Sequence, residues 1–275
     1  MLAEGDDARI IAGGQTLVPL MAMRLARPKL LIDIARIPDL AFIRKEGDVV
    51  VIGATARQCV LEHDPVVHAE VPLLTKVLPF VGHAPTRARG TIGGSLANAD
   101  PAAEIGLVAV TLGATITYRD GSATAEVPAA QFFQGPMMTA LPATACLTAV
   151  RFPVWREAHL GIGFHEISAR RSDFAFAAAA AQLALDGDGI CRRLALGIGA
   201  VTSVPRRLDG VGDALIGTRL EEGAVRTAVT EAMAGIDPMS DLHCSSDYRR
   251  RAAVTLAVRA ITDAAKAASR GVHVP

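Results

Sequence analysis

Two glycine-rich segments of the chain have the residue types that bind phosphate groups. Residues 12–16 read AGGQT and residues 91–95 read TIGGS, so each segment places two adjacent glycines beside small or polar side chains. Glycine has no Cβ, so such a turn lets a ligand approach the backbone closely, and its consecutive N–H groups can converge on an anion. A helix that starts just after the turn adds its positive end to the attraction. We therefore expect the two turns to meet and to bind both phosphates of a pyrophosphate, helped by their polar side chains.

A purely structural role for these segments stays open. A pair of adjacent glycines can simply form a tight turn, although two such pairs in similar surroundings favour a shared ligand. Neither segment reads G-x-G-x-x-G or G-x-x-x-x-G-K-[ST], so the sequence does not support a Rossmann or P-loop site. Arg87 and Arg89 precede the second segment. They could offset phosphate charge, but pairing with acidic surface neighbours is the interpretation that we favour.

The composition argues against several function classes. The chain has 275 residues, of which 51% are hydrophobic, which is enough for a substantial core in one to three compact units. Basic and acidic residues number 28 each, so the basic excess of a nucleic-acid-binding protein is absent. The four cysteines (Cys59, Cys146, Cys191 and Cys244) contain no C-x-x-C pair, and the seven histidines are scattered. We therefore expect no metal site and no iron–sulfur cluster, and no Ser/His/Asp or Cys/His catalytic set is apparent.

The sequence also lacks the patterns of membrane insertion and export. No apolar run reaches the roughly 18–20 residues needed to cross a bilayer. The first residues, MLAEGDDARI, have neither the basic region nor the apolar region of a signal peptide. We expect no transmembrane segment and a cytoplasmic location.

The periodicity predicts two successive α/β units in the first part of the chain. In the first unit, residues 1–53, we expect strands at 8–11, 30–34 and 48–53 and a helix at 17–26. In the second unit, residues 54–153, we expect helices at 54–64, 71–83 and 101–113 and strands at 114–120 and 146–153. The helix at 101–113 would take Asp100 as its N-cap and Pro101 in its first turn.

In the third unit, residues 154–275, local propensity and pattern disagree. An alanine-rich stretch favours a helix, but the sequence DGDG between two apolar segments of 174–201 favours a hairpin. We choose the hairpin, with the alanines on a sheet crowded by neighbouring elements. Two helices are expected to follow, at 219–235 and 246–269.

The order of these motifs resembles that of the flavin-binding medium subunit of the molybdenum hydroxylases. The similar segments are AGGQTLVPLMAMRLARPKLLIDIARI, IGATAR, RARGTIGGSLANADPAAEI, FHEISARRSDFA and SDYRRRAAVTLAVRAI, which span nearly the whole chain. This family includes aerobic carbon monoxide, nicotinate, quinoline and caffeine dehydrogenases and the flavin domain of xanthine dehydrogenase. The resemblance implies an α+β fold of the vanillyl-alcohol oxidase (PCMH) type. Two N-terminal α/β subdomains would clamp FAD, and a C-terminal antiparallel sheet with helices would complete the molecule.

The resemblance also implies which residues bind FAD. In relatives an acidic residue after the second loop contacts the ribityl or ribose hydroxyls, and Asp100 and Glu104 match it. A carboxylate suits a diol because it accepts two hydrogen bonds. Alternatively, Asp100 caps a helix and Glu104 is solvated. Leu147 would pack near the flavin through its backbone, and Phe174 would cover the ring or pack in the core. The implied set is Ala12, Gly13, Gly14, Gln15, Thr16, Leu17, Thr91, Ile92, Gly93, Gly94, Ser95, Asp100, Glu104, Leu147 and Phe174.

The chain departs from the family pattern in two places. Many relatives carry a lysine near the flavin at the position of Glu166. Relatives also have an additional strand and helix before the segment that matches LAEGDDARI, which suggests a misassigned or trimmed start. The missing strand would leave one edge of the first unit unpaired, so we expect its stability to depend on partners.

The function that the resemblance implies is electron transfer by FAD within a larger complex. A molybdopterin-binding large subunit would oxidise the substrate, and a small subunit would hold two [2Fe-2S] clusters that pass electrons to FAD and on to an external acceptor. The resemblance implies a dimer of such heterotrimers. Two alternatives stay open. The first is a free-standing flavin-dependent oxidoreductase of the same fold, and the second is a flavin-free scaffold subunit.

Overall fold

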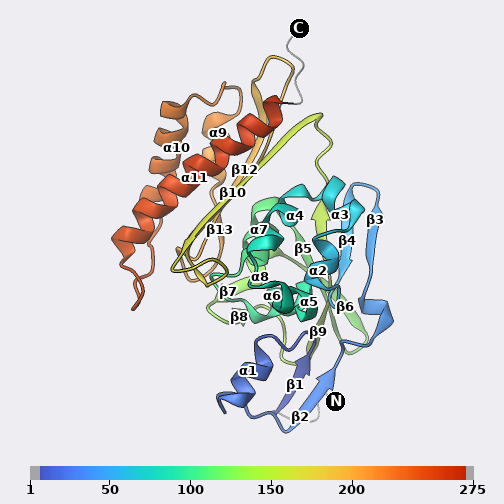
Figure 1. Ribbon diagram of the computed structural model, residues 1–275. Coiled ribbons are helices and arrows are strands. Elements are labelled where there is room, and N and C mark those ends of the chain that lie inside the picture. Colours follow the sequence, from blue (N-terminus) through green and yellow to red (C-terminus); the bar gives the residue numbers. More distant parts are fainter. Residues whose placement is uncertain (1–6, 271–275) are drawn as a thin grey trace.

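The computed structural model describes residues 7–270 and shows three layers (Figure 1). Residues 1–6 and 271–275 lie outside the described residues, so the expectation about a signal peptide, which depends partly on residues 1–6, is not addressed. No helix within residues 7–270 is long and apolar enough to span a membrane.

The first layer is a small βαβ unit. Strands β1 (Ala8–Ile11) and β2 (Leu30–Asp33) pair in parallel, and α1 (Leu17–Ala22) connects them. The two strands confirm the prediction, but α1 is shorter than the expected helix at 17–26. It ends early because Arg24 takes a positive φ of 60° and the Leu25 N–H turns back to the carbonyl of Leu20.

The second layer contains an antiparallel sheet covered by short helices. Its five strands follow the order β3 (Ile43–Glu46), β4 (Val49–Gly53), β9 (Ala145–Pro153), β5 (Thr115–Asp120) and β6 (Ala123–Pro128). The strands expected at 48–53, 114–120 and 146–153 are confirmed. The division of the chain at residues 53 and 153 stays a prediction, and β4 pairs directly with β9, which follows residue 53, so that β3 belongs to the same sheet.

The helices of this layer differ from the expected ones. They are α2 (Gln58–Leu61), α3 (Pro65–Glu70), α4 (Pro72–Val77), α5 (Ala84–Arg89), α6 (Ile92–Asn98), α7 (Glu104–Leu112) and α8 (Ala129–Phe132), with 3₁₀ turns η2 (Pro38–Leu40) and η3 (Leu78–Phe80). Of the helix expected at 54–64, only the short α2 forms. The carbonyls of Ala54 and Ala56 accept hydrogen bonds from the N–H groups of α6, so they cannot take part in a helix of their own. The helix expected at 71–83 gives way to η3 at Leu78, where Pro79 has no N–H to continue it. A small hairpin, β7 (Phe133–Gly135) and β8 (Met138–Thr139), follows α8.

The start of α7 corrects the prediction that Asp100 caps a helix. The Asp100 carboxylate accepts a hydrogen bond from the Ala102 N–H at 2.9 Å, which makes a local turn. The helix begins at Glu104, with Ala103 as its N-cap, so Pro101 lies outside it. The carbonyl of Pro101 instead accepts the N–H of Ala200 from the third layer at 2.8 Å.

The third layer is a sheet of β10 (His159–Ser168), β11 (Ala175–Leu185), β12 (Cys191–Gly199) and β13 (Arg206–Arg207). The predicted hairpin is confirmed, since β11 pairs antiparallel with β12. Alternate alanines of β11 enter two separate cores, with Ala178 and Ala180 in one and Ala177 and Ala179 in the other. Small side chains let helices pack closely on both faces, which outweighs the helix propensity of alanine.

Three helices accompany this sheet. They are α9 (Asp209–Leu215), α10 (Glu222–Ala234) and α11 (Ser246–Ser269). The helix expected at 246–269 is confirmed, and the one expected at 219–235 begins three residues later. The long α11 lies along the outer face of the sheet, while α7 packs on the face toward the second layer (Figure 1).

Candidate functional site

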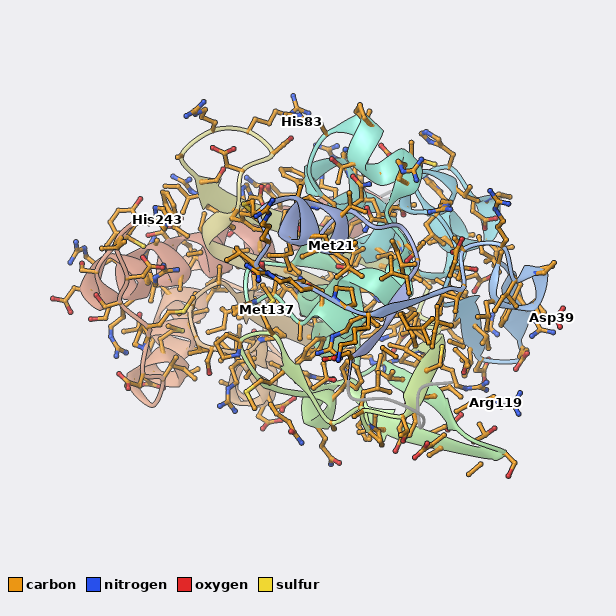
Figure 2. The ribbon with its side chains drawn as sticks, turned by 90° about the horizontal axis from the view of Figure 1, so that it is seen from below. Met21, Asp39, His83, Arg119, Met137 and His243 are labelled. Atoms are coloured by element: carbon orange, nitrogen blue, oxygen red, sulfur yellow. The ribbon has the colours of Figure 1, made fainter. Side chains whose placement is uncertain are left out.

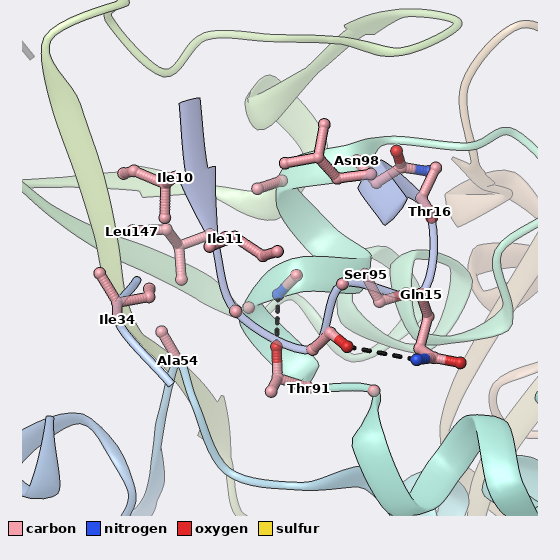
Figure 3. A pocket seen from close by; sticks show the side chains of 18 of the residues that line it. Ile10, Ile11, Gln15, Thr16, Ile34, Ala54, Thr91, Ser95, Asn98 and Leu147 are labelled. Carbon is pink, nitrogen blue, oxygen red and sulfur yellow. Dashed lines mark hydrogen bonds between the residues drawn. The ribbon is translucent and has the colours of Figure 1, made fainter. Parts of the chain in front are cut away.

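A cavity of about 550 Å³ lies between the βαβ unit and the second layer (Figure 3). This volume falls within the roughly 300–1,000 Å³ of cofactor and small-molecule sites. Strand β1 and the loop after it form one side, and α6 and the beginning of β9 form the other. Most of the residues expected at a cofactor site line it: Ala12, Gly13, Gly14, Gln15, Thr16, Leu17, Thr91, Gly93, Gly94, Ser95 and Leu147.

The two glycine-rich segments meet in space at this cavity. A Cβ on Gly13 would clash with the carbonyl oxygen of Arg89 and would lie 2.9 Å from the Cα of Gly90. Gly14 has a positive φ of 72°, which favours glycine over residues with a Cβ. The first loop therefore rests directly on the chain that enters the second segment, and it does so only because its glycines leave room.

The first loop, residues 12–16, presents backbone donors that the protein does not use. None of the five N–H groups of residues 12–16 forms a hydrogen bond with another described residue. The carbonyls of Gly14 and Thr16 accept from Val18 and Leu20, which fixes the loop at the start of α1. Consecutive free N–H groups around a concave turn are an anion site.

The second segment is not a turn, which corrects the prediction. Gly93 and Gly94 lie in the first turn of α6, and Thr91 is the N-cap whose Oγ1 accepts from the Gly94 N–H at 3.0 Å (Figure 3). The N–H groups of Ile92 and Gly93 donate to the carbonyls of Ala56 and Ala54. Four of the five amides of this segment, those of Ile92, Gly93, Gly94 and Ser95, are thus satisfied within the protein, and what the segment offers the cavity is side chains and close backbone packing.

A buried acceptor in the cavity wall also lacks a partner. The Oε1 atom of Gln58 is buried and has no hydrogen bond within residues 7–270. An unpaired buried carbonyl costs about 1–3 kcal/mol unless a ligand or water donates to it. Apolar walls flank this acceptor, among them Ile10, Ile34 and Leu147. A ligand with a planar apolar part, hydrogen-bonding edges and an anionic group fits this lining, and FAD has all three.

Four residues of the expected set lie outside the cavity lining. Ile92 is fully buried in the core behind α6. Asp100 and Glu104 follow α6, and Glu104 is largely buried, so the alternative of a solvated helix position is wrong. Phe174 is 73% exposed, so the alternative of core packing is wrong for it.

The structure adds lining residues that sequence reasoning missed. They are Arg9, Ile10, Ile11, Leu20, Ile34, Ala54, Gln58, Gly90, Ala97, Asn98, Met137, Leu141 and Cys146. Two features of the sequence pointed to these residues: the side chains of β1, which point alternately to its two faces, and the polar Gln58 directly after IGATAR. That they line the same cavity depends on the tertiary fold and could not be predicted from either segment. Figure 2 looks onto the face that carries α1 and labels Met21 on that helix and Met137 of the lining.

The arginines beside the loop have separate roles. Arg87 pairs with Glu62 at 2.9 Å, which confirms pairing with an acidic neighbour, but both side chains are largely buried, so the pair does not lie on the surface as expected. Arg89 forms no ion pair within the described residues, and its carbonyl accepts from the Arg57 guanidinium. Arg36, Arg57 and Arg89 line a second hollow of about 650 Å³ that shares the glycine loop with the first.

Two carboxyl groups next to the site have unusual pKa values. Burial, and secondarily the charge of Asp100, raises the pKa of Glu104 to about 7. Burial, and secondarily the charge of Glu104, raises the pKa of Glu166 to about 8. Burial also raises the pKa of the Cys146 thiol in the cavity wall. No cluster of three or more potential metal ligands occurs within residues 7–270.

The fold and the site together define an α+β protein whose glycine loop, with N–H groups that have no partner within residues 7–270, lines a cavity of cofactor size. The family of FAD-binding domains in molybdopterin dehydrogenases matches residues 1–155, more than half of the chain. The CO dehydrogenase flavoprotein C-terminal domain matches residues 163–264. The chain belongs to this family of FAD-binding flavoproteins and has its PCMH-type fold.

Individual relatives agree with this membership. The chain is 35% identical to the carbon monoxide dehydrogenase medium chain of Afipia carboxidovorans, over 94% of this chain and 88% of the relative. It is 34% identical to the 6-hydroxypseudooxynicotine dehydrogenase complex subunit alpha of Paenarthrobacter nicotinovorans, over 96% of this chain and 89% of the relative. Among solved structures, quinoline 2-oxidoreductase from Pseudomonas putida 86 superposes with a TM-score of 0.91 at 37% identity, covering 97% of this chain and 92% of that one.

Proposed function

We propose that this chain is the FAD-carrying electron-transfer subunit of a cytoplasmic molybdenum hydroxylase complex. It takes electrons from the [2Fe-2S] clusters of a small partner subunit and passes them to an external acceptor. A molybdopterin-binding large subunit carries out the substrate oxidation, and two such heterotrimers form a dimer. Relatives named as medium chains or medium subunits support this assignment of separate roles to separate subunits.

The observation that carries the proposal is the row of amides in residues 12–16 beside the buried Oε1 of Gln58 in one cavity, all without a hydrogen-bond partner in the described part of the chain. The loop amides bind the diphosphate of FAD without a lysine or arginine. Gln58 and Ser95 hydrogen-bond polar groups of the cofactor, and the apolar walls exclude water from it. Bound FAD supplies one- and two-electron redox chemistry at its ring, and the protein orients and shields it.

The location of the ring follows from the expected set. Residues 12–16 hold the diphosphate, Leu147 in the cavity wall packs near the flavin, and Asp100 and Glu104, beyond Asn98 at the end of α6, contact the ribityl or ribose hydroxyls. Phe174, exposed on the loop after β10, is then free to cover the ring or to meet a partner subunit. In this arrangement the chain needs no acid–base catalytic residue of its own.

The test is purification of the chain together with the products of its neighbouring coding sequences. We expect the complex to contain FAD, molybdopterin and iron–sulfur clusters, and we expect its flavin absorption band to bleach when the molybdenum subunit receives substrate. A complex whose clusters are reduced while its flavin stays oxidised would contradict the electron-transfer role. Turnover by the isolated chain would favour a free-standing oxidoreductase, and a folded, colourless protein would favour a scaffold.

A further inference from the structure

Arg249, near the start of α11, places a charged side chain in the protein core. Its exposed fraction is only 2%. The guanidinium donates hydrogen bonds to the carbonyl of Phe176 at 2.6 Å and to the carbonyl of Ala200, and it forms an ion pair with Asp241. Its Nε atom is buried and has no partner within residues 7–270. Burial of a charge is costly unless the charge is paired and hydrogen-bonded, so these three contacts must hold together for the core to form.

The three acceptors belong to three different segments of the chain. Phe176 is in the first turn of the strand path of β11, Ala200 directly follows β12, and Asp241 lies in the connection between α10 and α11. Because β11 and β12 are antiparallel, the carbonyls of Phe176 and Ala200 lie at the same end of the sheet. The ring of His243, labelled in Figure 2, stacks on that of Phe176, with 5.9 Å between the ring centroids. Arg249 therefore gathers these segments at one end of the C-terminal sheet.

This end of the sheet also carries the two segments that the proposed FAD site needs beyond the cavity lining. The exposed Phe174 lies two residues before Phe176, on the loop that leads into β11. The Ala200 N–H donates to the carbonyl of Pro101 at 2.8 Å, within the segment 100–104. The buried guanidinium thus binds a carbonyl next to the loop of Phe174 and another on the residue that holds the segment 100–104.

The same contacts continue to the wall of the cavity. The carbonyl of Ala99 accepts from the Met137 N–H at 3.0 Å, and Met137 and Asn98 both line the cavity. Ala99 and Ala200 have positive φ angles of 51° and 58°, which residues with a Cβ rarely adopt, so the surrounding contacts must hold them. At Ala200 both backbone groups are used, the N–H by Pro101 and the carbonyl by Arg249.

We propose that Arg249 is a positioning residue that holds the loop of Phe174 and the segment 100–104 together around the flavin half of the cofactor. The inference rests on the proposed FAD site, although the anchoring of the two segments does not. Arg249 need not touch the cofactor. A planar guanidinium suits this role because its several N–H groups reach separate acceptors at once. Without it the two segments move apart, and water reaches the flavin.

Arg250, the next residue, provides a matched control. Its guanidinium also donates to two backbone carbonyls, those of Met233 and of Ile236, the latter at 2.7 Å. Both acceptors lie at the end of α10, so Arg250 fastens α11 to α10 and not to the loop of Phe174 or to the segment 100–104. Arg250→Met therefore removes comparable hydrogen bonds from the same helix without affecting the proposed flavin contacts.

The first part of the test uses the apoprotein and amide hydrogen exchange measured by mass spectrometry. Arg249→Met should speed exchange by about tenfold in residues 98–104 and 169–177, because local opening there becomes easier. In Arg250→Met these two segments should exchange as in the wild type. Equal exchange of these segments in Arg249→Met and Arg250→Met would overturn the anchoring, whether or not the protein binds FAD.

A second variant covers the case in which Arg249→Met does not fold. Asp241→Asn removes the charge that pairs with Arg249, while its remaining side-chain oxygen can still accept the N–H groups of His243 and Cys244. The side chain of Asp241 is 40% exposed, so the substitution leaves no new cavity in the core. It should speed exchange in the same two segments, and exchange as in the wild type would overturn the anchoring.

The second part of the test uses the FAD-loaded chain. The flavin absorption band of the wild type should show the resolved shoulder of a ring shielded from water. Arg249→Met should lose this shoulder, and Arg250→Met should keep it even if its melting temperature falls as far. A lower melting temperature with an unchanged flavin spectrum in Arg249→Met would make Arg249 merely structural and overturn its positioning role. A wild type that binds no FAD would contradict the proposed function, while the exchange data would still decide the anchoring.

Discussion

Residues 12–16 and residues 91–95 are similar in sequence, but their backbone N–H groups have different roles in the structure. The first segment leaves all its N–H groups unused by the rest of the described chain, while the second uses its N–H groups to start α6 and to fasten it to the carbonyls of Ala54 and Ala56. Gly13 of the first pair makes room for the backbone of Arg89 and Gly90 while the amides of its loop stay unpaired within the described chain, and Gly93 of the second pair makes room for Ala54. A glycine pair therefore shows that something approaches the backbone, and only the hydrogen-bond inventory shows what does.

The largest expected effect is on FAD binding by Gly13→Val. The new side chain would clash with the Arg89 carbonyl, so the loop must move and its N–H groups lose their common focus. Each charge-assisted hydrogen bond contributes about 1.5–3 kcal/mol, so the loss of two predicts a weakening of about 100-fold or more. Titration of the apoprotein with FAD, followed by flavin fluorescence, measures this loss.

Gly210→Ala is the control for this substitution. A Cβ at Gly210, in α9, would meet no atom within 4 Å. We expect FAD affinity and melting temperature close to those of the wild type. If Gly13→Val bound FAD as tightly as this control, the first loop would not be the diphosphate site and the contrast between the two segments would fail.

The next effect is a loss of stability in Gly93→Ala. A methyl group at this position would lie 2.7 Å from both the Cβ and the carbonyl oxygen of Ala54. Overpacking of this kind costs about 1–3 kcal/mol, and the gain in helix propensity from alanine, at most about 1 kcal/mol, offsets part of it. Urea denaturation of the apoprotein should show the loss. A large drop in FAD affinity with unchanged apoprotein stability would mean that the second segment, too, serves the ligand directly.

The sequence was enough to predict the parts that depend on local chemistry. The parallel β1 and β2, the hairpin of β11 and β12 and the long α11 all follow from periodicity and turn residues, and most of the expected site residues share one cavity. The end of the helix at Leu78 was readable too, because Pro79 follows.

What could not be predicted depends on contacts between distant segments. The sequence TIGG fits a turn and a capped helix equally well, and the choice is made by Ala54 and Ala56, which lie far away along the chain. Glu104 likewise reads as an exposed residue of a helix start. It is largely buried at the start of α7, the helix that packs on β11 and β12 more than sixty residues later in the chain, and its charge raises the pKa of Glu166 on β10. No pattern within either segment reports such a neighbour.

A smaller stability effect is expected for Thr91→Val. Valine keeps the shape of threonine but removes the oxygen that accepts the Gly94 N–H at 3.0 Å. Loss of an N-cap of this kind costs about 1 kcal/mol, and Thr91→Ser, which keeps the hydroxyl, should recover most of it. Both variants are compared by urea denaturation without FAD. Equal stability of Thr91→Val and the wild type would show that the cap does not hold the second segment.

The smallest effect is expected for Ser95→Ala. This variant tests whether a side chain of the second segment contributes to ligand binding. Ser95 lines the cavity, and its hydroxyl forms no hydrogen bond within residues 7–270, unlike that of Thr91. Ser95→Ala should therefore leave the apoprotein stability unchanged and weaken FAD binding by about threefold to tenfold, the value of one neutral hydrogen bond. Binding titrations and urea curves on the same preparation separate the two quantities. A stability loss without a change in affinity would place the Ser95 hydroxyl among the structural contacts of α6, and the second segment would then contribute only shape to the cavity.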